Sequence, residues 1–200
     1  MLNQQIQAVL EELEVWGQQN DREQTDRSRK MLNLERQTAE LVRALVAGRH
    51  PRCILEIGTS NAYSTIWLAA SVVSGGRVIS IDRDPQKVQM AERNLQRTGL
   101  RDRVELIAGS ASAVVASISG PIDVVFFDAD RFSAPEQLAL LLPKLSANAL
   151  LLADNVLSHP DEIAGYLGAV QQLSDFEHTI VPVGKGLSIA HRIADTTSGR

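Results

Sequence analysis

The sequence predicts an α/β fold with a Rossmann-like, doubly wound and mostly parallel sheet of seven strands. From residue 51 onward, short apolar segments alternate with helical segments, and the apolar segments are nearly continuous runs. Continuous apolar runs are typical of strands that are buried on both faces of a parallel sheet. The last two apolar segments flank a Gly-Lys-Gly turn, which predicts a C-terminal antiparallel hairpin.

The strand segments are rich in Val, Ile, Leu and Phe. Parallel strands are expected over 53–58, 76–82, 103–109, 122–130 and 149–155, and the two hairpin strands within 176–193. The intervening segments carry apolar residues at helical spacing. They predict helices over 61–74, 85–98, 110–118, 134–147 and 160–173. This alternation predicts right-handed crossovers between neighbouring strands.

The chain length of 200 residues suits one well-filled domain with a short extension. Residues 1–50 are predicted to form a helical N-terminal extension, with a polar interruption at "GQQNDREQTDRSR". Residues 51–195 are predicted to form the main domain. Three roles stay open for the extension: capping the sheet, covering the active site, or forming a dimer contact.

Composition excludes several kinds of partner. The net charge of −4 argues against nucleic acid, because phosphate-backbone binding needs a basic face. No segment approaches the roughly 18 apolar residues of a membrane span. The N-terminus lacks the basic region and cleavage site of a signal peptide, so a cytoplasmic location is expected. Cys53 is the only cysteine, which excludes an internal disulfide and indicates a buried structural thiol.

The first motif is "LEIGTSNAYSTIW", in which Gly58 ends the first predicted strand. Ligands of open α/β sheets bind at the carboxyl ends of the strands, and a glycine there lets a ligand approach closely. Glu56 lies within the apolar strand and needs hydrogen-bond donors or a cationic partner if it is buried. The alternative interpretation is a plain strand–helix turn with an acid that caps a nearby group.

The second motif is "ISIDRDP", in which Asp82 ends the second strand, 24 residues after Gly58. An acid there can accept hydrogen bonds from both hydroxyls of a ribose. The alternative role, an N-cap for the helix that begins at Pro85, suits Asp84 better. The first loop has one glycine and no Lys or Arg, so it suits pyrophosphate poorly. A ligand with a ribose and no phosphate, such as S-adenosylmethionine, fits better.

The third motif is the pair "FFDAD" and "LLLADN". Asp128, Asp130, Asp154 and Asn155 end two strands that are expected to be neighbours. Clustered acids repel one another unless a cation lies among them, and oxygen ligands suit a hard cation such as Mg²⁺, Ca²⁺ or Mn²⁺. The alternative is that these residues only form turns.

In this order and spacing, the motifs resemble class I S-adenosylmethionine-dependent methyltransferases, and among them the cation-dependent O-methyltransferases of the catechol and caffeoyl-CoA type. The resemblance runs from about Met31 to Ile193. It is carried by "LEIGTSNAYST", "IDRDP", "AGSA", "FFDAD", "LLADNV" and "VGKGLSIAHR".

The resemblance implies site residues and a mechanism. An S-adenosylmethionine site would be lined by Glu56, Gly58, Thr59, Ser64, Asp82, Ala111 and Asp130. A divalent cation, usually Mg²⁺, would be bound by Asp128, Asp154 and Asn155. In that family two vicinal hydroxyls of a small acceptor bind the metal, and the acidified hydroxyl attacks the methyl group. The resemblance also implies a homodimer.

Three positions depart from the family pattern. Ala62 replaces a glycine, Arg131 replaces a lysine that can act as general base, and "RFSAPEQL" lacks a tyrosine. Arginine does not deprotonate in proteins, so Arg131 is predicted to orient Asp128 or to hold an anionic substrate. A surface salt bridge is the alternative for Arg131. His159 either reaches the acceptor side or is an incidental loop residue.

The predicted function is therefore cation-assisted methyl transfer from S-adenosylmethionine to a hydroxyl of a small acceptor, most simply an aromatic vicinal diol. Two alternatives stay open: a metal-independent methyltransferase with another acceptor, and a protein that binds S-adenosylmethionine without turnover. A nicotinamide oxidoreductase is disfavoured by the single-glycine loop and by the absence of a substrate domain in the sequence.

Overall fold

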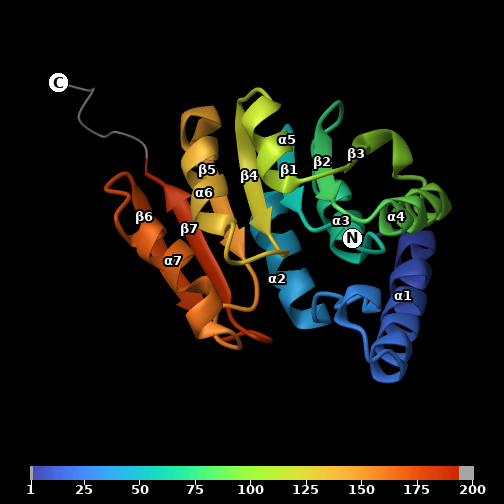
Figure 1. Ribbon diagram of the computed structural model, residues 1–200. Coiled ribbons are helices and arrows are strands. Elements are labelled where there is room, and N and C mark those ends of the chain that lie inside the picture. The colour runs from blue at the N-terminus through green and yellow to red at the C-terminus, as the bar shows by residue number, and fades with distance from the viewer. Residues whose placement is uncertain (1, 194–200) are drawn as a thin grey trace.

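The computed structural model describes residues 2–193 and confirms the predicted fold class. One seven-stranded sheet has the order β3-β2-β1-β4-β5-β7-β6 (Figure 1). Its strands are β1 (Cys53–Ile57), β2 (Arg77–Asp82), β3 (Val104–Ala108), β4 (Ile122–Phe127), β5 (Leu145–Ala153), β6 (Phe176–Val181) and β7 (Leu187–Arg192). Strands β1 to β5 pair in parallel, whereas β7 pairs antiparallel with both β5 and β6. The antiparallel hairpin lies where the Gly-Lys-Gly turn predicted it.

Helices cover both faces of the sheet. They are α1 (Gln4–Glu23), α2 (Arg36–Gly48), α3 (Tyr63–Ala69), α4 (Pro85–Thr98), α5 (Ala111–Ser117), α6 (Ala134–Leu141) and α7 (Pro160–Gln171), with short 3₁₀ turns η1 (Arg27–Arg29), η2 (Arg101–Arg103) and η3 (Leu142–Lys144). Successive side chains of a strand point to opposite faces. Accordingly, Ile54 of β1 packs with α1 to α4, while Leu55 and Ile57 pack with α5 to α7. The strands read as continuous apolar runs because both faces are buried.

The N-terminal extension packs onto the same face of the sheet as α3 and α4 (Figure 1). Helix α1 continues through Gly17 to Glu23, so the polar interruption expected from the sequence begins too early. A Cβ at Gly17 would lie 2.5 Å from Asn33 Nδ2, and Asn33 donates a hydrogen bond to the Leu13 carbonyl. Glycine at this point therefore allows close packing of two segments and does not end the helix. The predicted division begins at residue 1 and ends at residue 195, both outside the described residues.

One ionic group connects the extension to the body of the protein. The Glu14 carboxylate of α1 accepts hydrogen bonds from the Arg36 guanidinium at the start of α2 and from the Tyr63 hydroxyl at the start of α3. The Tyr63 side chain is 1% exposed. The first turn of α3 is thus bonded to α1 through Tyr63 and Glu14, and Arg36 of α2 holds the same carboxylate in place.

Two helix boundaries differ from the prediction for local reasons. Helix α3 begins only at Tyr63, because Ala62 adopts a left-handed conformation with φ 71° directly before it, and the helix ends at Ala69, before the predicted residue 74. Helix α6 ends at Leu141, and β5 already begins at Leu145, where the sequence predicted helix. Pro143 follows within η3, and proline cannot donate the backbone hydrogen bond that would extend α6.

Among residues 2–193, no helix combines the length and apolar character that crossing a bilayer requires.

Candidate active site

Backbone pairing brings four residues from four strands side by side at one edge of the sheet. Gly58 N donates to the Ile81 carbonyl, Asp128 N to the Ile57 carbonyl and Asp154 N to the Phe127 carbonyl, at 2.9 to 3.1 Å. These bonds continue the parallel ladders one residue beyond the strands. Asp82, Gly58, Asp128 and Asp154 therefore lie in adjacent positions at the carboxyl ends of β2, β1, β4 and β5. This is the edge at which open α/β sheets bind ligands.

Gly58 is required by the packing of the backbone. Its φ of 111° lies in a region that only glycine adopts easily, and a Cβ would lie 2.4 Å from the Asp128 carbonyl oxygen. The sequence interpretation gave a tight turn and the close approach of a ligand as the reasons for this glycine. In the structure, the contact between the ends of β1 and β4 is sufficient reason.

The loop after Gly58 turns sharply into α3. Ser60 has φ 48° and Ala62 has φ 71°, both in the left-handed region. For alanine this conformation costs roughly 1–2 kcal/mol. The Ser60 hydroxyl donates to the Met31 carbonyl at 2.7 Å, so the α1–α2 connection touches this loop. Met31 has no recognisable signal in the sequence, because the contact depends on tertiary packing.

Glu56 lies beneath the loop and does not reach its surface. The residue is 0% exposed, and its carboxylate accepts hydrogen bonds from Ser64 and Thr65 at 2.5 Å and from Ser80 at 2.6 Å. Burial raises the pKa of Glu56 to about 7, and the three hydroxyls oppose this rise. A direct contact between Glu56 and a ligand is therefore not provided by this conformation. Instead, Glu56 holds the first turn of α3 against β1 and β2.

The two polar residues next to this network are buried as well. Ser64 is 6% exposed and its hydroxyl is engaged by Glu56, while Thr59 is 1% exposed and shares a 2.6 Å hydrogen bond with Ser80. Both side-chain hydroxyls already have protein partners, so these residues support the loop from within the protein.

Asp82 keeps the hydrogen-bonding capacity that a ribose requires. Its Oδ2 accepts from Ser60 N at 2.8 Å and its Oδ1 from Asp84 N at 2.9 Å. Each carboxylate oxygen has a second lone pair, so two further hydroxyls can donate to it. Asp84 caps α4 by accepting from Gln86 N, as the sequence predicted. The roles of the two acids are thus separate.

Ala111 follows β3, the strand that neighbours β2 on the side away from β1. It is the first residue of α5, which follows β3 after a loop of two residues. Gly109 N donates to the Asp82 carbonyl at 2.9 Å, which holds this loop beside the end of β2. Ala111 itself is half-buried. The loops after β1, β2 and β3 therefore all bond to Asp82, the first two through its carboxylate and the third through its backbone carbonyl.

The ends of β4 and β5 carry an acidic pair with an amide between them. Asn155 Nδ2 donates to Asp154 Oδ2 at 2.6 Å and lies 3.5 Å from Asp128 Oδ1. The other oxygen of Asp154, Oδ1, is buried and accepts no hydrogen bond from the described part of the chain. Burial raises the pKa of Asp154 to about 6. Burial and the Asp154 charge raise the pKa of Asp128 well above its usual range.

This arrangement fits a hard divalent cation. Two carboxylates and one amide are oxygen donors of the type that Mg²⁺ and Ca²⁺ prefer, and one carboxylate has a buried oxygen that lacks a partner within residues 2–193. Asn155 presents its NH₂ group to the carboxylates, and a half-turn of the amide would place its oxygen there instead. Across residues 2–193 no group of three or more His, Cys, Asp or Glu side chains is arranged to hold a metal. The candidate site therefore depends on the Asn155 amide as its third ligand.

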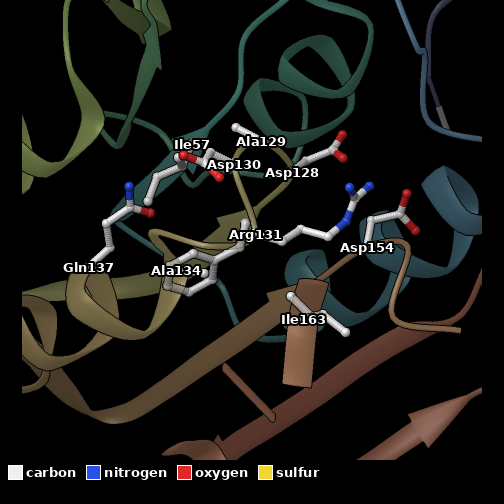
Figure 2. A pocket seen from close by; sticks show the side chains of 10 residues that line it. Ile57, Asp128, Ala129, Asp130, Arg131, Ala134, Gln137, Asp154 and Ile163 are labelled. Atoms are coloured by element: carbon white, nitrogen blue, oxygen red, sulfur yellow. The ribbon is translucent and has the colours of Figure 1, made fainter. Parts of the chain in front are cut away.

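Arg131 lies beside the acidic pair and is largely buried. Figure 2 shows its guanidinium reaching toward the carboxylates of Asp128 and Asp154. Its charge lowers the pKa of both acids, in opposition to burial. The Arg131 side chain is 12% exposed and forms a 2.9 Å ion pair with Glu162 of α7. The pair is a part-buried connection between the β4–α6 loop and α7, because the Glu162 side chain is 33% exposed. The salt bridge considered from the sequence is present, but its arginine lies mostly below the surface.

Asp130 is separated from the other acids. Its carboxylate accepts from Phe132 N and from the Ser133 hydroxyl, and the residue is exposed. In Figure 2, Asp130 and Gln137 lie on one side of a small pocket, and Asp128 and Asp154 on the other. The sequence analysis did not single out Gln137, whose buried Oε1 lacks a partner among residues 2–193. A glutamine within an amphipathic helix gives no signal for such a role.

His159 follows the loop that carries the acidic pair, and its backbone N–H donates to the Asn155 carbonyl at 3.4 Å. It precedes α7 as its N-cap residue, and its Nδ1 shares a 2.8 Å hydrogen bond with the neighbouring Ser158 hydroxyl. The structure thus gives His159 a local partner at the start of α7.

The Rossmann-like sheet, the acid at the end of β2 and the loop without phosphate-binding glycines together define the class I methyltransferase fold. Comparison with known proteins agrees: the family model described as O-methyltransferase matches residues 7–193. The chain belongs to this O-methyltransferase family.

Individual relatives are similar over part or most of the chain. A catechol O-methyltransferase from Mycobacterium tuberculosis (strain ATCC 25618 / H37Rv) is 37% identical over 115 residues, which cover 56% of this chain and 52% of that protein. A catechol O-methyltransferase from Niastella koreensis is 35% identical over 108 residues, 52% of this chain and 49% of that protein. The chain thus spans about half the length of these curated relatives. A solved O-methyltransferase from Bacillus cereus, in complex with SAH, superimposes with a TM-score of 0.78 at 25% identity, covering 93% of this chain and 91% of that one.

Proposed function

We propose that the chain is an S-adenosylmethionine-dependent O-methyltransferase that methylates a hydroxyl of a small aromatic vicinal diol with the help of a divalent cation. One observation carries the proposal: the strand ladders place Asp82 two strands away from Asp128 and three from Asp154, on one edge of the sheet. A ribose-binding acid and a cation-binding pair at one edge would bring a nucleoside cofactor and a metal-held acceptor together.

The cofactor half would be formed by the loops after β1, β2 and β3. Asp82 would accept hydrogen bonds from the two ribose hydroxyls, while Gly58 and Ala111 would contribute backbone walls. Asp130, which lies on the Gln137 side of the pocket, would contact the cofactor from that side. Glu56, Thr59 and Ser64 would act from below by fixing the first turn of α3. S-adenosylmethionine supplies a methyl group on a cationic sulfur, which an acidic edge of this kind accommodates.

The acceptor half would be formed by Asp128, Asp154 and Asn155. A divalent cation held there supplies a Lewis acid that lowers the pKa of an acceptor hydroxyl. The two aspartates would fix the position of the diol relative to the ribose acid. Such orientation is a large part of catalysis in bimolecular transfers.

Arg131 would position the acceptor half and would not accept a proton. The guanidinium stays protonated in proteins. Its ion pair with Glu162 holds it beside Asp128, where its positive charge favours the ionised form of that carboxyl. A metal-independent reaction is the second candidate, because the Arg131 guanidinium already supplies a positive charge next to both carboxylates.

The deciding experiment follows transfer of a labelled methyl group from S-adenosylmethionine to 1,2-dihydroxybenzene, with Mg²⁺ or with excess EDTA. The cation-assisted mechanism predicts product only with Mg²⁺, and it predicts that Asp154→Asn loses this activity while binding S-adenosylhomocysteine as the wild type does. Full activity in EDTA would select the metal-independent candidate. Tight cofactor binding without product from any of a panel of diols would select a protein that binds without turnover. Light scattering tests the homodimer inferred from the resemblance.

A further inference from the structure

The hairpin that closes the sheet carries a basic residue to the acceptor side of the site. The turn between β6 and β7 contains Gly184, Lys185 and Gly186. Leu157 N donates to the Lys185 carbonyl at 2.9 Å, and Val156 N donates to the Gly186 carbonyl at 3.1 Å. The segment that receives the turn directly follows Asp154 and Asn155. The tip of the hairpin is therefore fixed against the loop that carries two of the three candidate cation ligands.

The backbone of this turn packs closely against its neighbours. Gly184 and Gly186 have φ values of 55° and 92°. A Cβ at Gly184 would lie 2.4 Å from Glu35 Oε2, and a Cβ at Gly186 would lie 2.5 Å from Leu157 Cγ. The turn is wedged between the start of α2 and the loop after β5. The Lys185 side chain, which is 47% exposed, is the part of the turn that can change its position.

The charges around Lys185 differ from those around Arg131. Lys185 Nζ lies 3.9 Å from Glu35 Oε1, and the two side chains are 47% and 46% exposed. Such a long, half-exposed pair is weak, in the range of about 0–1 kcal/mol. Arg131, by contrast, is mostly buried and closely paired with Glu162. Both cations lower the pKa of Asp128 and of Asp154, so the field of Lys185 also reaches the acidic pair.

We propose that Lys185 is a specificity-determining residue that binds an anionic group, such as a carboxylate, on the acceptor. The inference rests on the proposed function and gives the acceptor a chemical class: an acidic diol rather than a neutral or cationic one. A carboxylate on the acceptor would replace Glu35 as the partner of the ammonium group. The exchange has a small energetic cost because the existing pair is weak. The hydrogen bonds of the turn keep the Lys185 backbone next to the loop that carries Asp154 and Asn155, and the long side chain can then reach an acceptor bound there.

The test compares 3,4-dihydroxybenzoate with the neutral diol 1,2-dihydroxybenzene. Two readouts are taken for each: kcat/KM for methyl transfer, and Kd for the protein saturated with S-adenosylhomocysteine and Mg²⁺. The wild type is expected to prefer the carboxylate. Lys185→Gln should reduce this preference about fivefold, and Lys185→Glu about 25-fold, because reversal changes the charge by two units. Lys185→Arg keeps the charge and should keep the preference.

Two further variants make the result specific. Glu35→Gln removes the competing carboxylate and should strengthen the preference for 3,4-dihydroxybenzoate. Arg93→Gln removes an exposed positive charge from α4 and should leave the preference unchanged. A wild type without preference, or a preference that Lys185→Glu leaves unaltered, would overturn the proposal. If no acceptor is methylated but the Kd preference exists and Lys185→Glu reverses it, the proposed function fails while the role of Lys185 stands.

Discussion

Replacing Glu56 by glutamine should change how the stability of the protein depends on pH. Glu56 is fully buried, and its pKa in the folded protein is raised from 4.5 to about 7, first of all by burial. An acid whose pKa is raised by folding favours the folded state while it is protonated. Its contribution is therefore fully present below pH 4.5 and is lost as the pH rises through 7. Glutamine has the same shape and does not ionise.

The size of the effect follows from the shift. Each pKa unit corresponds to about 1.4 kcal/mol, so a shift from 4.5 to about 7 corresponds to roughly 3.5 kcal/mol of unfolding free energy over the whole pH range. Roughly 2.5 kcal/mol of this is lost between pH 5 and pH 8, because part of the change occurs below pH 5. Relative to Glu56→Gln, the wild type should lose stability by that amount over this range. The pKa of Asp128 is also raised, by burial, by the Asp154 charge and by the Glu56 charge. Removal of the Glu56 charge should lower the pKa of Asp128, which adds to the difference between the two proteins in the same direction.

Urea unfolding of both proteins at half-unit intervals from pH 5 to pH 8, with EDTA present throughout, measures this difference. Glu105→Gln replaces an exposed carboxyl on β3 and serves as the control. If the curves of wild type and Glu56→Gln run parallel across the range, the buried carboxyl does not titrate there and the reasoning fails. A difference of opposite sign would mean that the three hydroxyls favour the ionised form more strongly than burial disfavours it.

Further predictions concern other parts of the same edge. Asp82→Ala should weaken S-adenosylhomocysteine binding by about tenfold or more in calorimetry and leave Mn²⁺ binding unchanged, because hydrogen bonds to a charged group contribute roughly 1.5–3 kcal/mol; unchanged cofactor affinity would refute the ribose assignment. Ala62→Gly should alter the unfolding free energy by less than about 1 kcal/mol, because relief of the left-handed conformation offsets the lost methyl group, whereas Ala62→Val should cost about 2 kcal/mol or more. Equal effects of these two substitutions in urea unfolding would argue against φ 71° at this position. Tyr63→Phe should lower the unfolding free energy by about 1 kcal/mol through loss of its hydrogen bond to Glu14, and a double-mutant cycle with Glu14→Gln that shows no coupling would contradict the contact.

The strands of the sheet could be predicted from the sequence, because short, continuous apolar segments that alternate with helical segments are compatible with few structures other than a buried parallel sheet. Continuous apolar runs predicted β1 to β5, and the ladders then place Asp82, Asp128 and Asp154 together because parallel strands end at one edge. The grouping of Asp128, Asp154 and Asn155 was predictable for the same reason.

Other features depend on contacts that periodicity does not encode. The role of Glu56 beneath the loop requires knowing that Ser64, Thr65 and Ser80 all point at it from α3 and β2. Asp130 lies in the same sequence motif as Asp128 but is directed away by the turn that begins with it. Continuation of α1 through Gly17 depends on packing against Asn33, which is far along the chain.

The contact between Gly58 and the Asp128 carbonyl has a consequence for engineering the protein. Any side chain at position 58 must push the end of β4 outward, and the displaced residue is a candidate cation ligand. Efforts to graft a different cofactor loop onto β1 would therefore disturb the acceptor half, even if no substituted residue faced the acceptor. The two halves should be redesigned jointly, with position 58 left unchanged or with the β4–α6 loop rebuilt to follow it.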